Sequence, residues 1–217
     1  MTSVRRYQDP CGIARALDVL GDRWALLVVR ELIFGPKRFV QLRGSLRGIS
    51  PNVLSQRLCD LQDAGILRHG VLEQPASVAI YELTARGRAL EPILLELGRW
   101  GSEEPIESTA ELSASSLLLA LKTVFDRGTA ADGTFALSID GQWFSMTTAA
   151  DSIDIASGRP ENPSVALEAD VATLRSVAFG REPISRAEQA GRLTVRGDRE
   201  LAEQFVRMFP APSQPTL

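Results

Sequence analysis

The chain has 217 residues, 44% of them apolar, which is enough for one large domain or two modest domains with packed cores. Two cysteines are too few for a disulfide scaffold, and the two cysteines and the single histidine do not have the spacing of zinc ligands. No run of the sequence reaches the ~18 consecutive apolar residues that a membrane helix needs. Residues 1–101 hold 14 Lys/Arg against 10 Asp/Glu and residues 102–217 hold 10 against 17, so only the first half suits a polyanionic partner.

The first 46 residues predict three helices. The first is expected over residues 13–20, where apolar residues recur at helical spacing before Gly21. Asp22 can cap a second, buried helix, which a Gly-Pro pair ends. A third, short helix is expected over residues 39–46.

A fourth helix over residues 51–64 has the clearest signals. Ser50 is a good N-cap, and Pro51 suits the first helical position. Its leucines repeat at helical spacing, so they should face inward. The polar residues expected to face outward near its start are Asn52, Ser55, Gln56 and Arg57. Side chains of these types can pair with base edges or phosphates.

Residues 66–72 and 78–83 predict two strands joined by a loop over residues 73–77, after which Thr84 can cap a last helix. Helices followed by a two-stranded hairpin and a further helix are the order of a winged helix-turn-helix. Such a domain places one helix in the major groove of DNA. A solvated amphipathic helix without a nucleic-acid partner is the alternative from composition.

Four motifs carry a resemblance to the HxlR family of bacterial winged-helix regulators. They are G-D-R-W at 21–24, G-P-K-R-F at 35–39, I-S-P-N-V-L-S-Q-R-L at 49–58 and Y-E-L-T-A-R-G at 81–87. The resemblance covers about 90 residues and implies a homodimer that binds a near-palindromic operator in double-stranded DNA. It implies DNA contacts from the turn before the third helix, from the fourth helix and from the two-stranded hairpin, which is called the wing. The residues expected to make these contacts are Lys37, Arg38, Ser50, Pro51, Asn52, Ser55, Gln56, Arg57, Arg68, His69, Gln74 and Ser77.

The resemblance also implies a dimer seam between the first and last helices of this domain. The apolar residues expected there are Ile13, Leu17, Leu90, Ile93, Leu94, Leu97 and Trp100. A two-fold pair of recognition helices would then meet half-sites ~34 Å apart. The alternative is that the last helix packs on the second half of the same chain.

Cys11 lies at the start of the first helix, with Arg15 one turn later. A helix N-terminus and a nearby cation favour the reactive thiolate, and several regulators of this kind sense oxidants or electrophiles with a cysteine at this place. Cys11 is therefore a redox candidate, although a small apolar filler is the ordinary alternative.

The second half is expected to be a separate domain over residues 110–210, after a polar linker at 102–109 and before a tail at 211–217. The expected strands and helices alternate in a pattern that suits an antiparallel sheet with helices on one face. The fold class is therefore α+β, with a winged helix-turn-helix domain over residues 1–101.

This half resembles the sterol carrier protein type 2 family. The resemblance rests on F-A-L-S-I-D-G-Q-W-F at 135–144 and on the segment at 162–209. It implies an apolar cavity between sheet and helices that holds a hydrophobic small molecule. The candidate pocket residues are Trp143, Phe144, Met146, Leu174, Phe179, Phe205, Met208 and Phe209. The alternative is that these side chains only pack a core.

The sequence therefore predicts a cytoplasmic DNA-binding regulator, by default a repressor, whose DNA affinity responds to an apolar effector. A redox regulator acting through Cys11 and a lipid-like ligand carrier are the alternatives. We expect no signal peptide, cofactor, metal or membrane partner. We also expect no enzyme, because the chain has one histidine and no serine-nucleophile, phosphate-binding or dinucleotide-binding motif.

Overall fold

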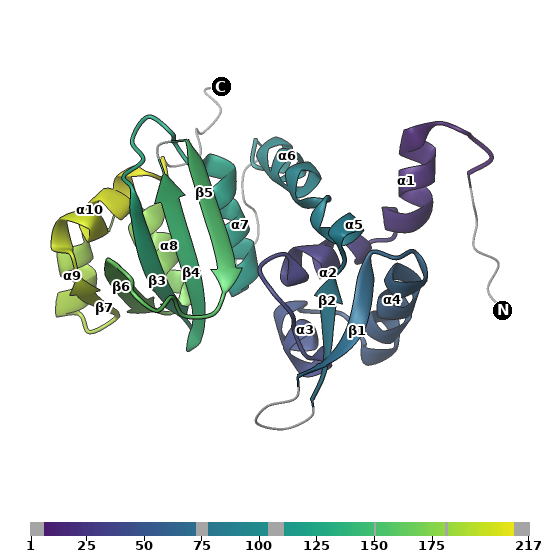
Figure 1. Cartoon of the computed structure of the whole chain (residues 1–217), viewed down its shortest axis with the longest axis horizontal. Coiled ribbons are helices and arrows are strands. Elements are labelled where there is room, and N and C mark those ends of the chain that lie inside the picture. The colour runs from purple at the N-terminus through teal and green to yellow at the C-terminus, as the bar shows by residue number, and fades with distance from the viewer. Residues whose placement is uncertain (1–6, 73–77, 104–110, 150, 181, 211–217) are drawn as a thin grey trace. The chain divides into compact units, whose positions relative to one another are not determined.

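The computed structural model describes residues 7–72, 78–103, 111–149, 151–180 and 182–210 (Figure 1). The chain divides into two compact units, residues 1–94 and 95–217. Most of the linker expected at 102–109, and the whole tail at 211–217, lie outside the described residues. Within the described part, no helix is both long and apolar enough to cross a membrane.

The first unit contains a helical core with a two-stranded hairpin. Its elements are α1 (Gly12–Leu20), α2 (Ala25–Leu32), α3 (Phe39–Ser45), α4 (Pro51–Asp63), β1 (Leu67–Leu72), β2 (Val78–Leu83), α5 (Ala85–Arg88) and α6 (Glu91–Gly101), whose last residues belong to the second unit. The hairpin is antiparallel, with Leu67 opposite Leu83. Val28, Leu42 and Leu54 are completely buried, so α2, α3 and α4 share one core.

Two helix starts differ from the sequence expectation. Asp22 does not cap α2, which begins at Ala25 without a side-chain cap. Thr84 caps the short α5 in place of the long final helix, because its Oγ1 accepts the N–H of Gly87 at 3.2 Å. A Cβ at Gly87 would clash with the Ile66 carbonyl oxygen, so this glycine lets α5 pack closely against the start of the wing.

The second unit is a five-stranded sheet with helices. Its further elements are α7 (Ala114–Val124), β3 (Gly133–Ile139), β4 (Gln142–Ala149), β5 (Ser152–Ser157), β6 (Val165–Ala169), α8 (Val171–Ala178), α9 (Ile184–Gln189), β7 (Leu193–Gly197) and α10 (Arg199–Arg207). The strand order is β5-β4-β3-β6-β7, and Figure 1 shows α7, α8 and α10 on the same face of the sheet. The short α9 was not expected from the sequence.

An antiparallel sheet was expected from the sequence, and this expectation is wrong at one pair of strands. β3 and β6 are parallel. The chain leaves β5 where the Gly158 N–H donates to the Trp143 carbonyl at 2.8 Å, and it enters β6 where the Ser164 N–H donates to the Thr134 carbonyl at 2.7 Å. The connection thus runs back along the sheet before β6 begins, so β6 takes the direction of β3.

Candidate nucleic-acid interface

The candidate recognition helix α4 is anchored by local signals that the sequence shows. The Ser50 hydroxyl accepts the N–H of Val53 at 3.3 Å, and Pro51 follows at the first helical position. Leu54, Leu58 and Leu61 are at most 1% exposed, so they fix one side of the helix in the core. The side opposite these leucines is therefore presented to solvent in a defined orientation.

The exposed side of α4 carries Asn52, Ser55 and Gln56 near its N-terminal end. Asn52 and Gln56 lie one turn apart, almost opposite the buried leucines, and Ser55 lies beside them. The Gln56 side-chain amide donates to Asp60 Oδ1 at 2.8 Å. Amide and hydroxyl groups in this arrangement can donate to and accept from base edges in the major groove.

Arg57 differs from the expectation of an outward side chain. It is only 18% exposed, its Nη1 pairs with Asp22, and its Nη2 lies 2.9 Å from Asp60 Oδ2. The reason is its place on the helix, three residues after Leu54 and next to Leu58, which turns the side chain toward the domain. Arg57 is therefore engaged within the protein.

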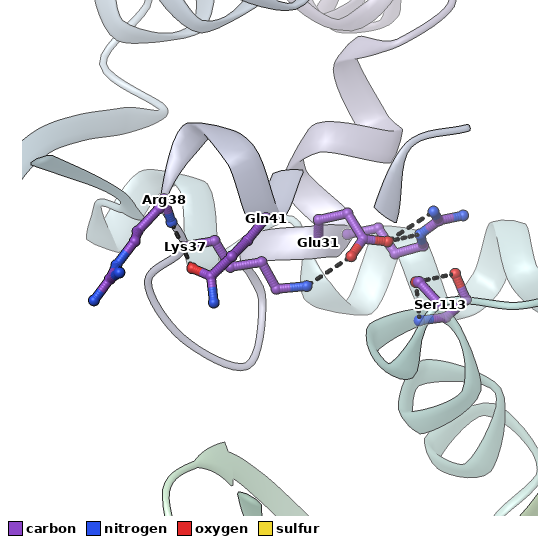
Figure 2. Close-up of polar contacts among 7 residues, drawn as sticks. Glu31, Lys37, Arg38, Gln41 and Ser113 are labelled. Carbon is purple, nitrogen blue, oxygen red and sulfur yellow. Dashed lines mark hydrogen bonds and ion pairs between the residues drawn. The ribbon is translucent and has the colours of Figure 1, made fainter. Parts of the chain in front are cut away.

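Lys37 was expected to face phosphates, and the structure contradicts this. It is 8% exposed, and its Nζ lies 2.7 Å from Glu31 Oε2, while the Arg30 guanidinium holds Glu31 Oε1 at 2.8 Å. Figure 2 shows Lys37 reaching toward Glu31 and Arg38 pointing the other way. A buried carboxylate needs cationic partners, so Lys37 turns inward to neutralise Glu31.

The backbone of Lys37 also joins the turn before α3 to the wing. Its N–H donates to the Tyr81 carbonyl at 3.0 Å, and the Tyr81 N–H donates back at 2.9 Å. Burial raises the pKa of Tyr81, and the nearby Cys59 raises it further. These contacts hold β2 against the helix-turn-helix.

Three of the exposed cations of this unit lie on α3 or directly beside it, ahead of α4. Arg38 is exposed, and its backbone N–H donates to Gln41 Oε1 at 2.8 Å. Arg43, on α3, and Arg47, between α3 and α4, are exposed as well. Neither arginine was among the DNA contacts expected from the sequence, although their places, four residues apart just before Ser50, could have identified them.

The described part of the wing carries two of its four predicted contact residues. Arg68 is exposed and its Nε donates to Glu82 Oε1 at 2.9 Å. His69 is exposed too, and its ring meets that of Tyr81 edge-on at 5.3 Å between centroids. Gln74 and Ser77 lie outside the described residues.

The residues predicted for a dimer seam fall into two groups. Ile13 and Trp100 are each 72% exposed, and Leu17, Ile93 and Leu97 are also exposed. Leu90 and Leu94 differ from this expectation because they are buried in the single chain. The apolar residues that the sequence predicted for the seam therefore include both core residues of the single chain and exposed residues.

Cys11 lies where the sequence placed it, exposed at the N-cap of α1. Its Sγ accepts the N–H of Ala14 at 3.5 Å. The Asp9 carboxylate accepts the Cys11 backbone N–H at 2.9 Å, which brings a negative charge near the same group.

In the second unit, the candidate pocket residues surround the helix-covered face of the sheet, with one exception. Phe144, Met146, Leu174, Phe205, Met208 and Phe209 are buried, and Phe179 is half-buried. The Phe205 ring packs against Phe135 and Phe209, with centroids 5.7 and 5.0 Å away. These side chains form a packed aromatic cluster between sheet and helices.

Trp143 is the exception, and its assignment to the pocket is wrong. Successive residues of a strand point to opposite faces, so Trp143 faces away from the side that Phe144 and Met146 occupy. Its ring is covered by the Arg159 guanidinium, whose Cζ lies 4.4 Å from the ring centroid. This contact is a cation–π pair on the other face of the sheet.

Comparison with known proteins gives two family matches. Residues 19–108 match the HxlR-like helix-turn-helix model, and residues 119–210 match the SCP-2 sterol transfer family. The HTH-type transcriptional regulator YvaP of Bacillus subtilis (strain 168) is 37% identical over 89 residues, which are 41% of this chain and 82% of YvaP. The regulator sll1512 of Synechocystis is 36% identical over 103 residues, 48% of this chain and 76% of the relative.

Among solved structures, the reduced form of the transcriptional regulator YodB from B. subtilis is 32% identical. The match covers 44% of this chain and 94% of that one, with a TM-score of 0.40.

Proposed function

The chain belongs to the HxlR-like helix-turn-helix family of DNA-binding transcriptional regulators, and we propose that it binds a near-palindromic operator as a dimer. It also carries a domain of the SCP-2 sterol transfer family. The observation that carries the proposal is α4, whose leucines are buried while Asn52, Ser55 and Gln56 are exposed near its start. The N-terminal end of a recognition helix is the part that contacts base edges.

The experiment selects binding sites from a random duplex library with the full chain and then measures affinity for the selected duplex. Asn52→Ala should lower this affinity at least about tenfold, because a bidentate amide–adenine pair contributes ~1–3 kcal/mol. Gln62→Ala is the matched control, since Gln62 is exposed on the same helix near its C-terminal end. Unchanged selectivity in Asn52→Ala would contradict the assignment of α4.

Dimerisation is supported by the apolar residues that a single chain leaves exposed on α1 and α6. Ile13 and Leu17 recur four residues apart on α1, where only Ala14 is buried. Exposed apolar surface of this kind is typical of a protein–protein interface. Ile13→Ser combined with Leu17→Ser should shift sedimentation toward the monomer and weaken operator binding, whereas Val40→Ser, on the exposed side of α3, should leave the mass unchanged.

The second unit is the proposed effector domain, with repression relieved when an apolar molecule binds between sheet and helices. Its support is the apolar character of that layer, where Phe144, Met146 and Phe205 are buried. A ligand can change DNA affinity only by binding one arrangement of the dimer better than another. Native mass spectrometry should find an apolar molecule with the purified chain, and a fluorescent sterol analogue should displace it and alter operator affinity. An empty domain that leaves DNA binding unchanged would contradict this part.

A thiol switch at Cys11 is the second candidate. It is favoured by one observation, the exposed Sγ at the N-cap of α1 that accepts the Ala14 N–H. Oxidation or alkylation there would place new bulk on the helix proposed for the dimer seam. N-ethylmaleimide, which adds to a single thiol, should then change operator affinity in the wild type and have no effect in Cys11→Ser, with Cys59→Ser as the control for the other exposed thiol.

A further inference from the structure

One ion-pair chain joins the recognition helix to the base of α1. The Arg57 guanidinium contacts Asp22 with Nη1 and Asp60 with Nη2, and Asp60 also accepts from Gln56. Asp22 belongs to the short step between α1 and α2, directly after the Gly21 that ends α1. The interaction therefore links two helices that are separated by 30 residues of sequence.

The geometry leaves Arg57 poorly placed to contact DNA. Each terminal nitrogen of its guanidinium already has a carboxylate partner, and the side chain is 18% exposed. A planar guanidinium can bridge two carboxylates at once, which a lysine ammonium cannot do with the same orientation. Moving Arg57 to a phosphate would break both ion pairs and leave Asp22 and Asp60 as negative charges near the DNA.

We propose that Arg57 is a positioning residue, which fixes α4 to the base of α1 through Asp22 and so sets the orientation of the recognition helix relative to the dimer seam. This assignment rests on the proposed DNA-binding dimer. In a dimer held by α1, the angle between α1 and α4 decides how far apart the two recognition helices lie. Asp22 and Arg57 would thus determine the spacing of half-sites that the dimer accepts.

The sign of the Asp22→Asn effect separates positioning from direct contact. If Arg57 contacted DNA, removal of the competing Asp22 carboxylate would release the guanidinium and strengthen binding. If Arg57 positions α4, the same substitution weakens operator binding even though the protein becomes less negative. Because Asp22 is 61% exposed, the pair is partly screened, and a loss of about three- to tenfold per dimer is expected.

The test measures affinity of the full chain for the library-selected duplex, for the same duplex with one extra base pair between half-sites, and for a random duplex. Asp22→Asn, Arg57→Met and the double variant should lose similar operator affinity and should discriminate less against the altered spacing. Affinity for random duplex should stay the same or rise. Glu188→Gln, which removes an exposed ion pair with Arg199 in the second unit, is the matched control.

The outcomes distinguish the two proposals. A lower fraction of folded protein would reduce affinity for all three duplexes equally, so a selective loss for the correctly spaced operator identifies positioning. Tighter operator binding by Asp22→Asn, or a salt slope that falls in Arg57→Met by about 0.9 per phosphate no longer neutralised, would overturn the assignment and leave the proposed function intact. A library that yields no enriched sequence would overturn the proposed function and this assignment with it.

Discussion

Two cations next to each other in the chain have opposite surroundings. Lys37 is buried on Glu31, whereas Arg38 is exposed. The difference arises because the fully buried carboxylate of Glu31, on α2, is contacted by Lys37 and by Arg30, whereas Arg38 points the other way. The residue type alone therefore does not decide whether a basic residue of this turn is free to meet a phosphate, because a buried acid nearby can engage it.

Substitution of these two residues should give opposite results. Lys37→Met should lower the free energy of unfolding by about 2–3 kcal/mol, because it removes one cation from the buried Glu31, and should leave the salt slope of DNA binding unchanged. Arg38→Ala should leave stability nearly unchanged and lower the slope by about 0.9 for each phosphate that the variant no longer neutralises. Urea unfolding and anisotropy titrations at several salt concentrations measure both. A lower slope in Lys37→Met would contradict its assignment to the interior.

The glycine of the Y-E-L-T-A-R-G motif has a steric role. A side chain at Gly87 would meet the Ile66 carbonyl, while Gly44 in α3 has open space around its Cβ position. Gly87→Ala should therefore destabilise the chain by about 1–3 kcal/mol. Gly44→Ala is the control and should be neutral or stabilising, since alanine is the better helix former. Equal melting temperatures for the two variants would contradict this explanation.

At the scale of the element, side-chain caps determine where several helices begin. Ser50, Asp170 and Asp198 each accept the backbone N–H of the third residue of the following helix. The caps set where α4, α8 and α10 begin, and buried apolar residues such as Leu54, Leu174 and Phe205 then pack these helices into the two cores. Local hydrogen bonds thus determine the start of the helix that carries the candidate contacts, and packing determines its orientation.

The segment from α8 to β7 is held by an ion pair that predicts a pH dependence. The hydrogen bond from Arg192, followed by that from Ser176, lowers the pKa of Glu182 below its ordinary value of 4.5. A lowered pKa means that this stabilisation is complete above pH 4.5 and is lost as the pH falls through the folded-state pKa. Between pH 5 and 3 the wild type should therefore lose more thermal stability than Glu182→Gln. Glu200→Gln, exposed on α10, is the control and should follow the wild type.

At the scale of the whole molecule, the chain contains two cores. Leu54 and Leu58 belong to the core of the first unit, and Phe135, Phe205 and Phe209 to that of the second. The basic first half of the sequence forms the unit with the candidate DNA contacts. The acidic second half supplies most of the negative charge, which is unsuited to contact with phosphates.

Two cores predict two unfolding transitions in calorimetry. Leu54→Ala should lower the free energy of unfolding of the first unit by about 2–5 kcal/mol, and Phe205→Ala should lower that of the second unit by about 3–5 kcal/mol. Both side chains are completely buried, so each variant should lower the temperature of one transition only. A single transition that both variants lower equally would contradict this prediction.

The local sequence was sufficient for most elements and for α4. Leucines at helical spacing, a serine cap and a proline at the first position predict the helix and its buried side. These signals act over three or four residues, so they need no knowledge of the rest of the chain. The short α9 and the parallel pairing of β3 with β6 have no comparably strong local signal.

The partners of individual side chains depend on how the packed elements meet, which the local sequence signals do not specify. Lys37 meets Glu31 because α2 packs beside the turn, Arg57 meets Asp22 because α4 crosses the step after α1, and Trp143 meets Arg159 because the chain returns along the sheet. Composition and periodicity could identify these residues as polar or aromatic and place them on an element. Whether each one faces DNA, the core or another side chain was settled by folding, since a charge or ring is drawn to whichever partner the packed chain brings within contact distance.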